Sequence, residues 1–131
     1  MLVSAWPQLT CKLCDFGFAT VLKGDALARG KWYTPGFAAP ELLSGYPYDT
    51  KIDIFSLGVV SYILLTGCIP WASDTWNDDA KVNDAMIQGK VQFHPEDWDV
   101  VSEEAKNFVQ WTMTTDPEFR PSAEDLYAHA W

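Results

Sequence analysis

The sequence predicts a mainly α-helical fold that begins with a short β-hairpin. Apolar residues make up 48% of the chain and aromatic residues 15%, which is enough to build a hydrophobic core. After residue 39, apolar residues recur with a helical period in several segments, and each segment carries a start or stop signal. No repeat or linker divides the 131 residues, so a single domain is expected.

The first third of the chain predicts a hairpin and then a long loop. Two short strands within residues 2–14, separated by a loop that contains Pro7, predict the hairpin. From Gly17 to Pro40 the apolar periodicity is lost, and a loop of that length in a compact domain usually serves binding. Pro40 suits the first turn of a short helix that ends near Gly45.

A long helix is expected over residues 50–67. Thr50 is its candidate N-cap, Asp53 is placed as a capping-box partner, and Gly67 is the terminator. The segment is apolar nearly all round, which is typical of a helix in the middle of a domain. Further helices are predicted over residues 78–88, 102–114 and 122–131, and the last two begin at serine caps.

Charge and cysteine content limit the functional classes. The net charge of -9 and pI of about 4.4 would repel nucleic acid and anionic membranes, so a basic protein partner is expected. The run from Ile54 to Leu65 falls short of the ~20 apolar residues that a bilayer span needs. Cys11, Cys14 and Cys68 cannot all pair. With no targeting segment visible, the expected location is the cytoplasm or nucleus, and not a secreted one.

Four motifs occur in one order along the chain. Asp15-Phe16-Gly17 alone could be a polar turn, but "APE" ends at Glu41, and "DIFSLG" and "DPEFRP" follow at residues 53–58 and 116–121. Together they resemble the carboxy-terminal lobe of a eukaryotic protein kinase, closest in character to the calcium/calmodulin-dependent serine/threonine group. The resemblance extends over residues 1–131, with an activation segment at 15–41 and helices from about residue 39 onward.

The resemblance implies ATP and Mg²⁺ as cofactors. Asp15 would bind the Mg²⁺ that bridges the β- and γ-phosphates, a role that suits a hard carboxylate ligand. Phe16 would pack beneath the active site, and Gly17 would permit backbone angles that a side chain resists. Leu2 matches the residue that lies under the adenine, although an ordinary core leucine explains it equally well.

The segment "YTPGFAAPE" resembles the substrate-docking loop of serine/threonine kinases. Thr34 would form a hydrogen bond with the catalytic aspartate, and Pro35, Gly36 and Phe37 would shape the pocket beside the phosphorylated residue. Turn geometry alone would also account for the proline and glycine. Tyr33 departs from the family, which usually has glycine before this threonine.

Three further residues match structural positions of the family. Glu41 and Arg120 would form a buried ion pair below the activation segment. Asp53 would accept hydrogen bonds from the catalytic-loop backbone, although its capping role alone could explain it. Val60 and Leu64 match positions that support the adenine-binding column, and core packing describes them equally well.

The activation loop offers little for regulation by phosphate. Between Gly17 and Tyr33 the only hydroxyl residue is Thr20, which lies too near the start, and Gly30 and Lys31 occupy the usual phosphorylation position. The loop is therefore not expected to be switched by a phosphate–arginine pair.

A zinc site is the remaining chemical alternative. Cys11 and Cys14 could join His94 and His129 as four ligands. Residues three apart on a strand face opposite sides of the sheet, so the two thiols are poorly placed to share a metal. The zinc interpretation is accordingly disfavoured.

A protein kinase also needs a glycine-rich nucleotide loop, a lysine–glutamate pair and a catalytic loop, and these residues match none of them. The sequence is therefore expected to be a fragment of an ATP-dependent serine/threonine kinase, inactive in isolation, with any regulatory domains outside it. The alternative is a non-catalytic, kinase-derived interaction module.

Overall fold

The computed structural model describes residues 11–71 and 78–131. Most of the predicted hairpin, including Leu2, lies outside these residues, and residues 12–14 form no strand. An isolated antiparallel bridge joins Ala28 to Tyr48. The described part of the chain is thus mainly helical with almost no strand, which confirms the predicted fold class and fits a kinase carboxy-terminal lobe.

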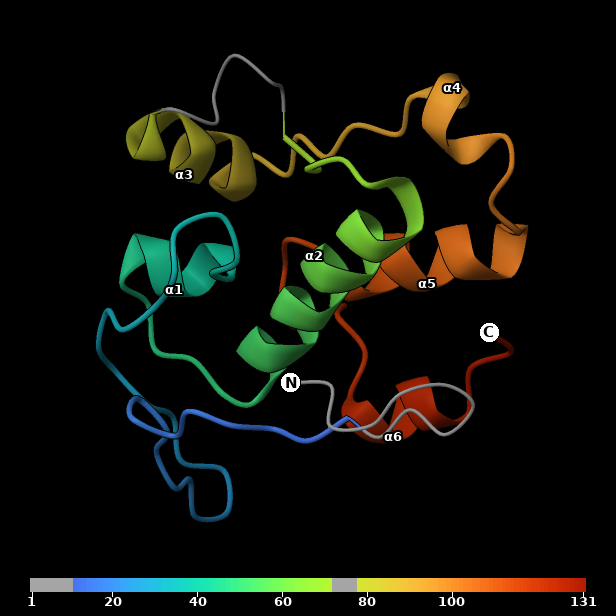
Figure 1. Cartoon of the computed structure of the whole chain (residues 1–131). Helices are drawn as coiled ribbons and strands as arrows, with labels where there is room; N and C mark the ends of the chain where they lie inside the picture. The colour runs from blue at the N-terminus through green and yellow to red at the C-terminus, as the bar shows by residue number, and fades with distance from the viewer. Residues whose placement is uncertain (1–10, 72–77) are drawn as a thin grey trace.

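A long central helix organises the fold (Figure 1). It packs against a second helix that crosses it, while two shorter helices contact each other on one side of it. The described helices are α1 (Pro40–Ser44), α2 (Lys51–Thr66), α3 (Asp79–Ile87), α4 (Pro95–Trp98), α5 (Glu103–Thr112) and α6 (Ala123–Tyr127). The crossing pair is α2 and α5, and the second contact joins α1 to α3. No helix in the described ranges is long and apolar enough to cross a membrane.

The described residues cover the central helix α2 on one side only. Phe55, Val59 and Tyr62 are buried in the core, as the apolar sequence predicts. The opposite side is open, with Val60 41% and Leu64 80% exposed. The core-packing interpretation of Val60 and Leu64 is therefore wrong for the described residues, because no described element packs over that side.

Several helix ends form as the sequence predicts. Gly45 and Gly67 end α1 and α2 in the left-handed conformation, with φ of 76° and 72°. The Ser102 hydroxyl accepts a hydrogen bond from the Ala105 N–H at 3.2 Å. Ser122 forms a capping box with its third helical residue at the start of α6.

The predicted capping box at the start of α2 is wrong. Thr50 has helical angles (φ -66°, ψ -14°), and its side chain forms no cap hydrogen bond. The Asp49 carboxylate instead accepts a hydrogen bond from the Lys51 N–H at 2.8 Å. The capping side chain therefore belongs to Asp49, one residue before the predicted Thr50, and the Asp53 side chain takes no part in the cap.

An aromatic cluster beside α2 holds the short helix α4, which was not among the predicted helices. The ring of Tyr62 contacts Trp98 edge to face at a centroid distance of 5.0 Å, and Phe93 packs against both. The Tyr62 hydroxyl donates a hydrogen bond to the Gln92 carbonyl at 2.6 Å. Burial raises the pKa of this phenol above its ordinary value. Burial of Trp98 thus stabilises a helix too short to be visible in the sequence pattern.

Candidate active-site segment

Asp15 lies in a tight, exposed turn. It is the one non-glycine residue with positive φ (63°) in the described part of the chain. Its Oδ1 atom accepts a weak hydrogen bond from the Gly17 N–H at 3.4 Å, and the Phe16 carbonyl accepts one from the Ala19 N–H at 3.1 Å. Left-handed angles are unfavourable for a residue with a side chain and tend to cluster at functional positions. The turn therefore presents the Asp15 carboxylate outward.

An exposed carboxylate of this kind can supply one ligand to Mg²⁺. Mg²⁺ usually keeps several waters and binds protein through one or two carboxylates together with nucleotide phosphates, so a single acid is a fitting donor set.

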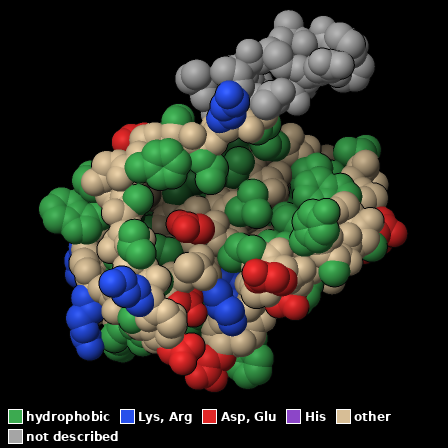
Figure 2. Space-filling view, turned by 90° about the horizontal axis from the view of Figure 1, so that it is seen from below, with side chains coloured by type: hydrophobic (Ala, Val, Ile, Leu, Met, Phe, Trp, Pro, Cys, Tyr) green, Lys and Arg blue, Asp and Glu red, His purple; other side chains and the backbone are tan. Residues whose placement is uncertain are grey.

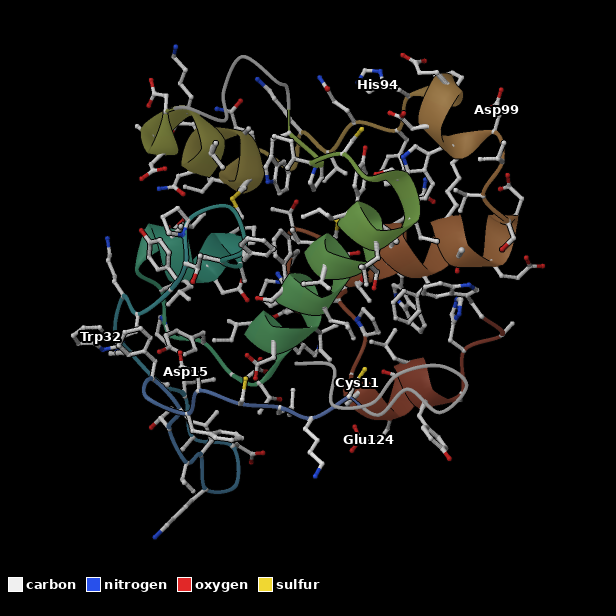
Figure 3. All side chains as sticks on the ribbon, in the orientation of Figure 1. Cys11, Asp15, Trp32, His94, Asp99 and Glu124 are labelled. Carbon is white, nitrogen blue, oxygen red and sulfur yellow. The ribbon has the colours of Figure 1, made fainter. Side chains whose placement is uncertain are left out.

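The disfavoured zinc site would need several clustered ligands. Within residues 11–71 and 78–131, no group of three or more His, Cys, Asp or Glu side chains is arranged to hold a metal. In Figure 3, Cys11 and His94 lie on opposite sides of the molecule.

Phe16 does not pack beneath a site in the structure. Its side chain is 69% exposed, because no described element passes over the Asp15 turn. Gly17 has no positive φ in the structure, so the left-handed position falls on Asp15. The role predicted for Gly17 is therefore displaced by two residues.

The segment from Thr34 to Phe37 forms a compact turn that hydrogen bonds fix to the core. The Phe37 N–H donates to the Thr34 carbonyl at 3.2 Å, and Gly36 has φ of 83°, which explains glycine at this position. The Ser56 hydroxyl donates to the Phe37 carbonyl at 2.8 Å. The buried indole N–H of Trp71 donates to the Gly36 carbonyl at 3.4 Å. Two backbone carbonyls of the turn are thus fixed by α2 and by Trp71, while Thr34 and Pro35 remain exposed.

A hollow of about 330 Å³ lies beside this turn. It brings together side chains from the turn, from α1 and from the start of α2, and these include Trp32, Tyr33, Thr34, Phe37, Asp53 and Ser56. The hollow therefore joins three of the residues predicted from the sequence. Tyr33, the departure from the family pattern, forms part of its wall and packs against the core.

Asp53 is the acid in this largely apolar hollow. Partial loss of water raises the pKa of its carboxyl above the ordinary value of 3.8. No hydrogen bond to this carboxylate is formed among the described residues. The Asp53 carboxylate could therefore accept hydrogen bonds, as predicted, but no described residue donates one to it.

Asp53→Asn is expected to stabilise the chain slightly at neutral pH. Because the folded-state pKa is raised, ionised Asp53 disfavours the folded state above that pKa, and the penalty disappears as pH falls toward 3.8. Since solvent screens this exposed side chain, we expect the free energy of unfolding to rise by only about 0.5 kcal/mol. Urea unfolding between pH 4 and pH 8 would measure it, with exposed Asp99→Asn as the control of equal charge change. A gain that is the same for both variants, or independent of pH, would contradict the assignment.

Glu41 and Arg120 form the predicted ion pair. Arg120 Nη1 lies 2.7 Å from Glu41 Oε1, and Nη2 lies 3.0 Å from Oε2, so the contact is bidentate. Only 2% of Arg120 and 7% of Glu41 is exposed. The three remaining N–H groups of the guanidinium donate to the carbonyls of Lys51, Thr114 and Thr115.

This one arginine therefore ties three parts of the fold together. Glu41 belongs to α1, which follows the turn of residues 34–37, and Lys51 begins α2. The other two carbonyls follow α5, and the guanidinium carbon lies 5.1 Å above the Phe55 ring. All five N–H donors have partners, so the pair fixes α1 to the start of α2 and to the segment after α5.

Sequence reasoning missed three contributors to the site. Trp32 lines the hollow, Ser56 holds the Phe37 carbonyl, and Trp71 holds the Gly36 carbonyl. Ser56 could have been noticed, because it is a polar residue within an otherwise apolar helix. Nothing in the local pattern distinguishes Trp71 from an ordinary core tryptophan.

Comparison with known proteins identifies the family. A family model for the protein kinase domain matches residues 1–131. The serine/threonine-protein kinase H1 homolog of Danio rerio is 39% identical over 121 residues, which are 91% of this chain and 28% of that protein. Calcium/calmodulin-dependent protein kinase type 1 of Caenorhabditis elegans is 35% identical over 119 residues, with coverage of 91% and 33%.

Two further relatives are a calcium/calmodulin-dependent kinase and a ribosomal protein S6 kinase. The calcium/calmodulin-dependent protein kinase type II alpha chain of Drosophila melanogaster is 34% identical over 136 aligned residues, with coverage of 100% and 24%. Ribosomal protein S6 kinase alpha-6 of Danio rerio is 36% identical over 121 residues, with coverage of 92% and 16%. The chain spans at most about a third of the length of these four relatives. It belongs to the protein kinase domain family, and its similar relatives include calcium/calmodulin-dependent and ribosomal S6 kinases.

Proposed function

We propose that these residues serve an ATP-dependent serine/threonine protein kinase, as the part that binds one Mg²⁺ and docks the protein substrate. The observation that carries the proposal is the hollow in which Thr34, Phe37 and Asp53 meet, beside a turn held by Ser56 and Trp71. The Glu41–Arg120 pair anchors the helix that follows this turn. The relative that is named a serine/threonine-protein kinase supports the same class of acceptor.

Each residue then has a defined task. Asp15 would hold Mg²⁺ through its outward carboxylate. When bound, ATP would supply the transferable phosphoryl group, and Mg²⁺ would neutralise the negative charge of the phosphates. Thr34 and the turn that follows it position the acceptor segment of the substrate beside the hollow. Asp53 accepts backbone N–H groups that enter the hollow, which returns its pKa toward the ordinary range.

The proposed substrate is a basic protein. The net charge of -9 favours association with basic partners and makes it weaken as salt rises. The proposed location is the cytoplasm or nucleus. The proposal also includes regulatory domains outside these residues, as the partial coverage of the relatives permits.

Asp15→Asn is expected to lower Mg²⁺-dependent phosphate transfer by the native protein at least about 100-fold, because an amide is a poor ligand for a hard cation. The measurement is phosphate incorporation from labelled ATP into a basic serine peptide, with the protein immunopurified from its source. Asp99→Asn is the matched control, since Asp99 is exposed and lies far from Asp15 (Figure 3).

The same assay decides between the proposed kinase and an interaction module. Native wild-type protein that transfers no phosphate, while still retaining partner proteins on the affinity resin, would replace the kinase proposal by the module. Equal activity of Asp15→Asn and Asp99→Asn would remove Asp15 from the site.

A further inference from the structure

The loop of residues 18–32 projects from the surface as a small lobe, a term used below for this loop alone and not for a lobe of a kinase domain. It extends away from the helices at the lower left of Figure 1. The Phe18 and Trp32 rings stack at its base, with centroids 5.3 Å apart and planes 23° from parallel. Two backbone hydrogen bonds, of 2.8 Å and 3.0 Å, join Ala28 to Tyr48 and anchor the loop to the segment that precedes α2. The loop is therefore closed and attached at defined points, although it contains no helix.

This lobe exposes large apolar side chains together. Phe18 is 69%, Val21 84%, Leu27 58% and Trp32 66% exposed. Scattered apolar side chains are ordinary on a protein surface, but four on one short loop, two of them stacked aromatics, are the usual composition of an interface centre. A stacked pair is also already ordered, so a partner that covers it loses little side-chain freedom on binding.

The charge of the lobe is opposite to that of the rest of the chain. Residues 18–32 carry three basic side chains and one acidic side chain, whereas the remaining residues carry six basic and seventeen acidic ones. In the described part of the chain, neither Lys23 nor Arg29 forms an ion pair. Figure 2 shows basic side chains among hydrophobic ones along the left of the face that is viewed from below. The lobe is thus a basic, aromatic surface on an otherwise acidic molecule.

We propose that the lobe, defined by Phe18, Val21, Lys23, Leu27, Arg29 and Trp32, is a docking surface for an acidic protein segment with apolar side chains. The aromatic and aliphatic side chains would provide the buried centre, and Lys23 and Arg29 would pair with carboxylates at the rim. An anionic membrane is disfavoured as the occupant for two reasons. The net charge of residues 18–32 is only +2, whereas membrane attraction usually needs four to eight basic residues, and the rest of the chain is acidic and would be repelled. Basic substrates would be repelled by Lys23 and Arg29, so this surface differs in charge from the proposed substrate hollow, which it adjoins at Trp32.

The test uses the full 131-residue chain and a defined probe. A fluorescein-labelled synthetic peptide, in which pairs of glutamate alternate with leucine or phenylalanine, is titrated with the chain and followed by fluorescence anisotropy. Trp32→Ala, and Lys23→Glu combined with Arg29→Glu, should each weaken binding at least about ten-fold. The glutamine version of the peptide should bind correspondingly weakly, and added salt should reduce the affinity of the glutamate version.

Matched variants elsewhere keep the result interpretable. Trp131 is another exposed tryptophan and Lys81 another exposed lysine, so Trp131→Ala and Lys81→Glu should leave the affinity unchanged. Circular dichroism checks that every variant keeps its helix content. The proposal is overturned if the loop variants bind like these controls. It is also overturned if phosphatidylserine vesicles bind the loop in preference to the peptide, or if sedimentation shows that a second copy of the chain occupies it.

Discussion

Arg120→Met is expected to lower the free energy of unfolding by about 3–5 kcal/mol, the usual cost of stranding one member of a buried ion pair. Methionine keeps most of the side-chain volume but removes all five N–H donors. Glu41 would then remain buried without its cation, and three carbonyls would lose their donors. Urea unfolding followed by circular dichroism measures the change.

Two companion variants isolate the pair. Lys81→Met removes an exposed ion pair of 3.6 Å, and its cost should stay within about 0.5 kcal/mol. Glu41→Leu combined with Arg120→Met should recover part of the loss, because no buried charge remains. If Arg120→Met lowers the free energy of unfolding no more than Lys81→Met does, the Glu41–Arg120 pair does not stabilise the fold.

Gly58→Ala is expected to lower the free energy of unfolding by about 2 kcal/mol, since overpacking a close contact outweighs the gain in helix propensity. A Cβ atom at residue 58 would lie 2.5 Å from Thr112 Oγ1 and 2.7 Å from Met113 Cγ, where α2 crosses α5. The Thr112 hydroxyl already donates to carbonyls of its own helix at 2.8 Å and 3.0 Å, so it cannot turn away freely.

The background Thr112→Ala tests the cause of this loss. Removing the hydroxyl eliminates the shortest contact, so Gly58→Ala should cost less in that background than in the wild type. The same urea titration measures both costs. A stabilising effect of Gly58→Ala in the wild type would mean that the two helices are farther apart than described.

Local signals predicted much of the fold. Gly45 and Gly67 end helices because left-handed backbone angles there favour glycine, and this requirement is visible in the sequence itself. Ser102 and Ser122 are likewise local caps. In contrast, the capping residue of α2 was predicted one position too late, because Thr50 and Asp49 are both acceptable caps and only the backbone angles distinguish them.

The parts of the site that depend on tertiary contacts were less accessible. Glu41 and Arg120 are separated by 79 positions, so only the resemblance to kinases predicted their pairing. Trp32 was not anticipated in the hollow, because no periodic pattern operates in a loop. The apolar pattern of α2 does not by itself show which side of the helix is uncovered, since an all-round apolar sequence does not reveal which side has a partner.

The proposal that these residues belong to a serine/threonine protein kinase can be tested by assaying the native protein for phosphate transfer. The most direct measurement incubates the native protein, purified from its source, with Mg-ATP and an equal mixture of basic peptides that contain serine, threonine or tyrosine. Mass spectrometry then identifies the phosphorylated residues. The account predicts Mg²⁺-dependent phosphoserine and phosphothreonine that disappear in the Asp15→Asn protein. Phosphate on tyrosine alone, or no transfer by the wild-type protein, would contradict it.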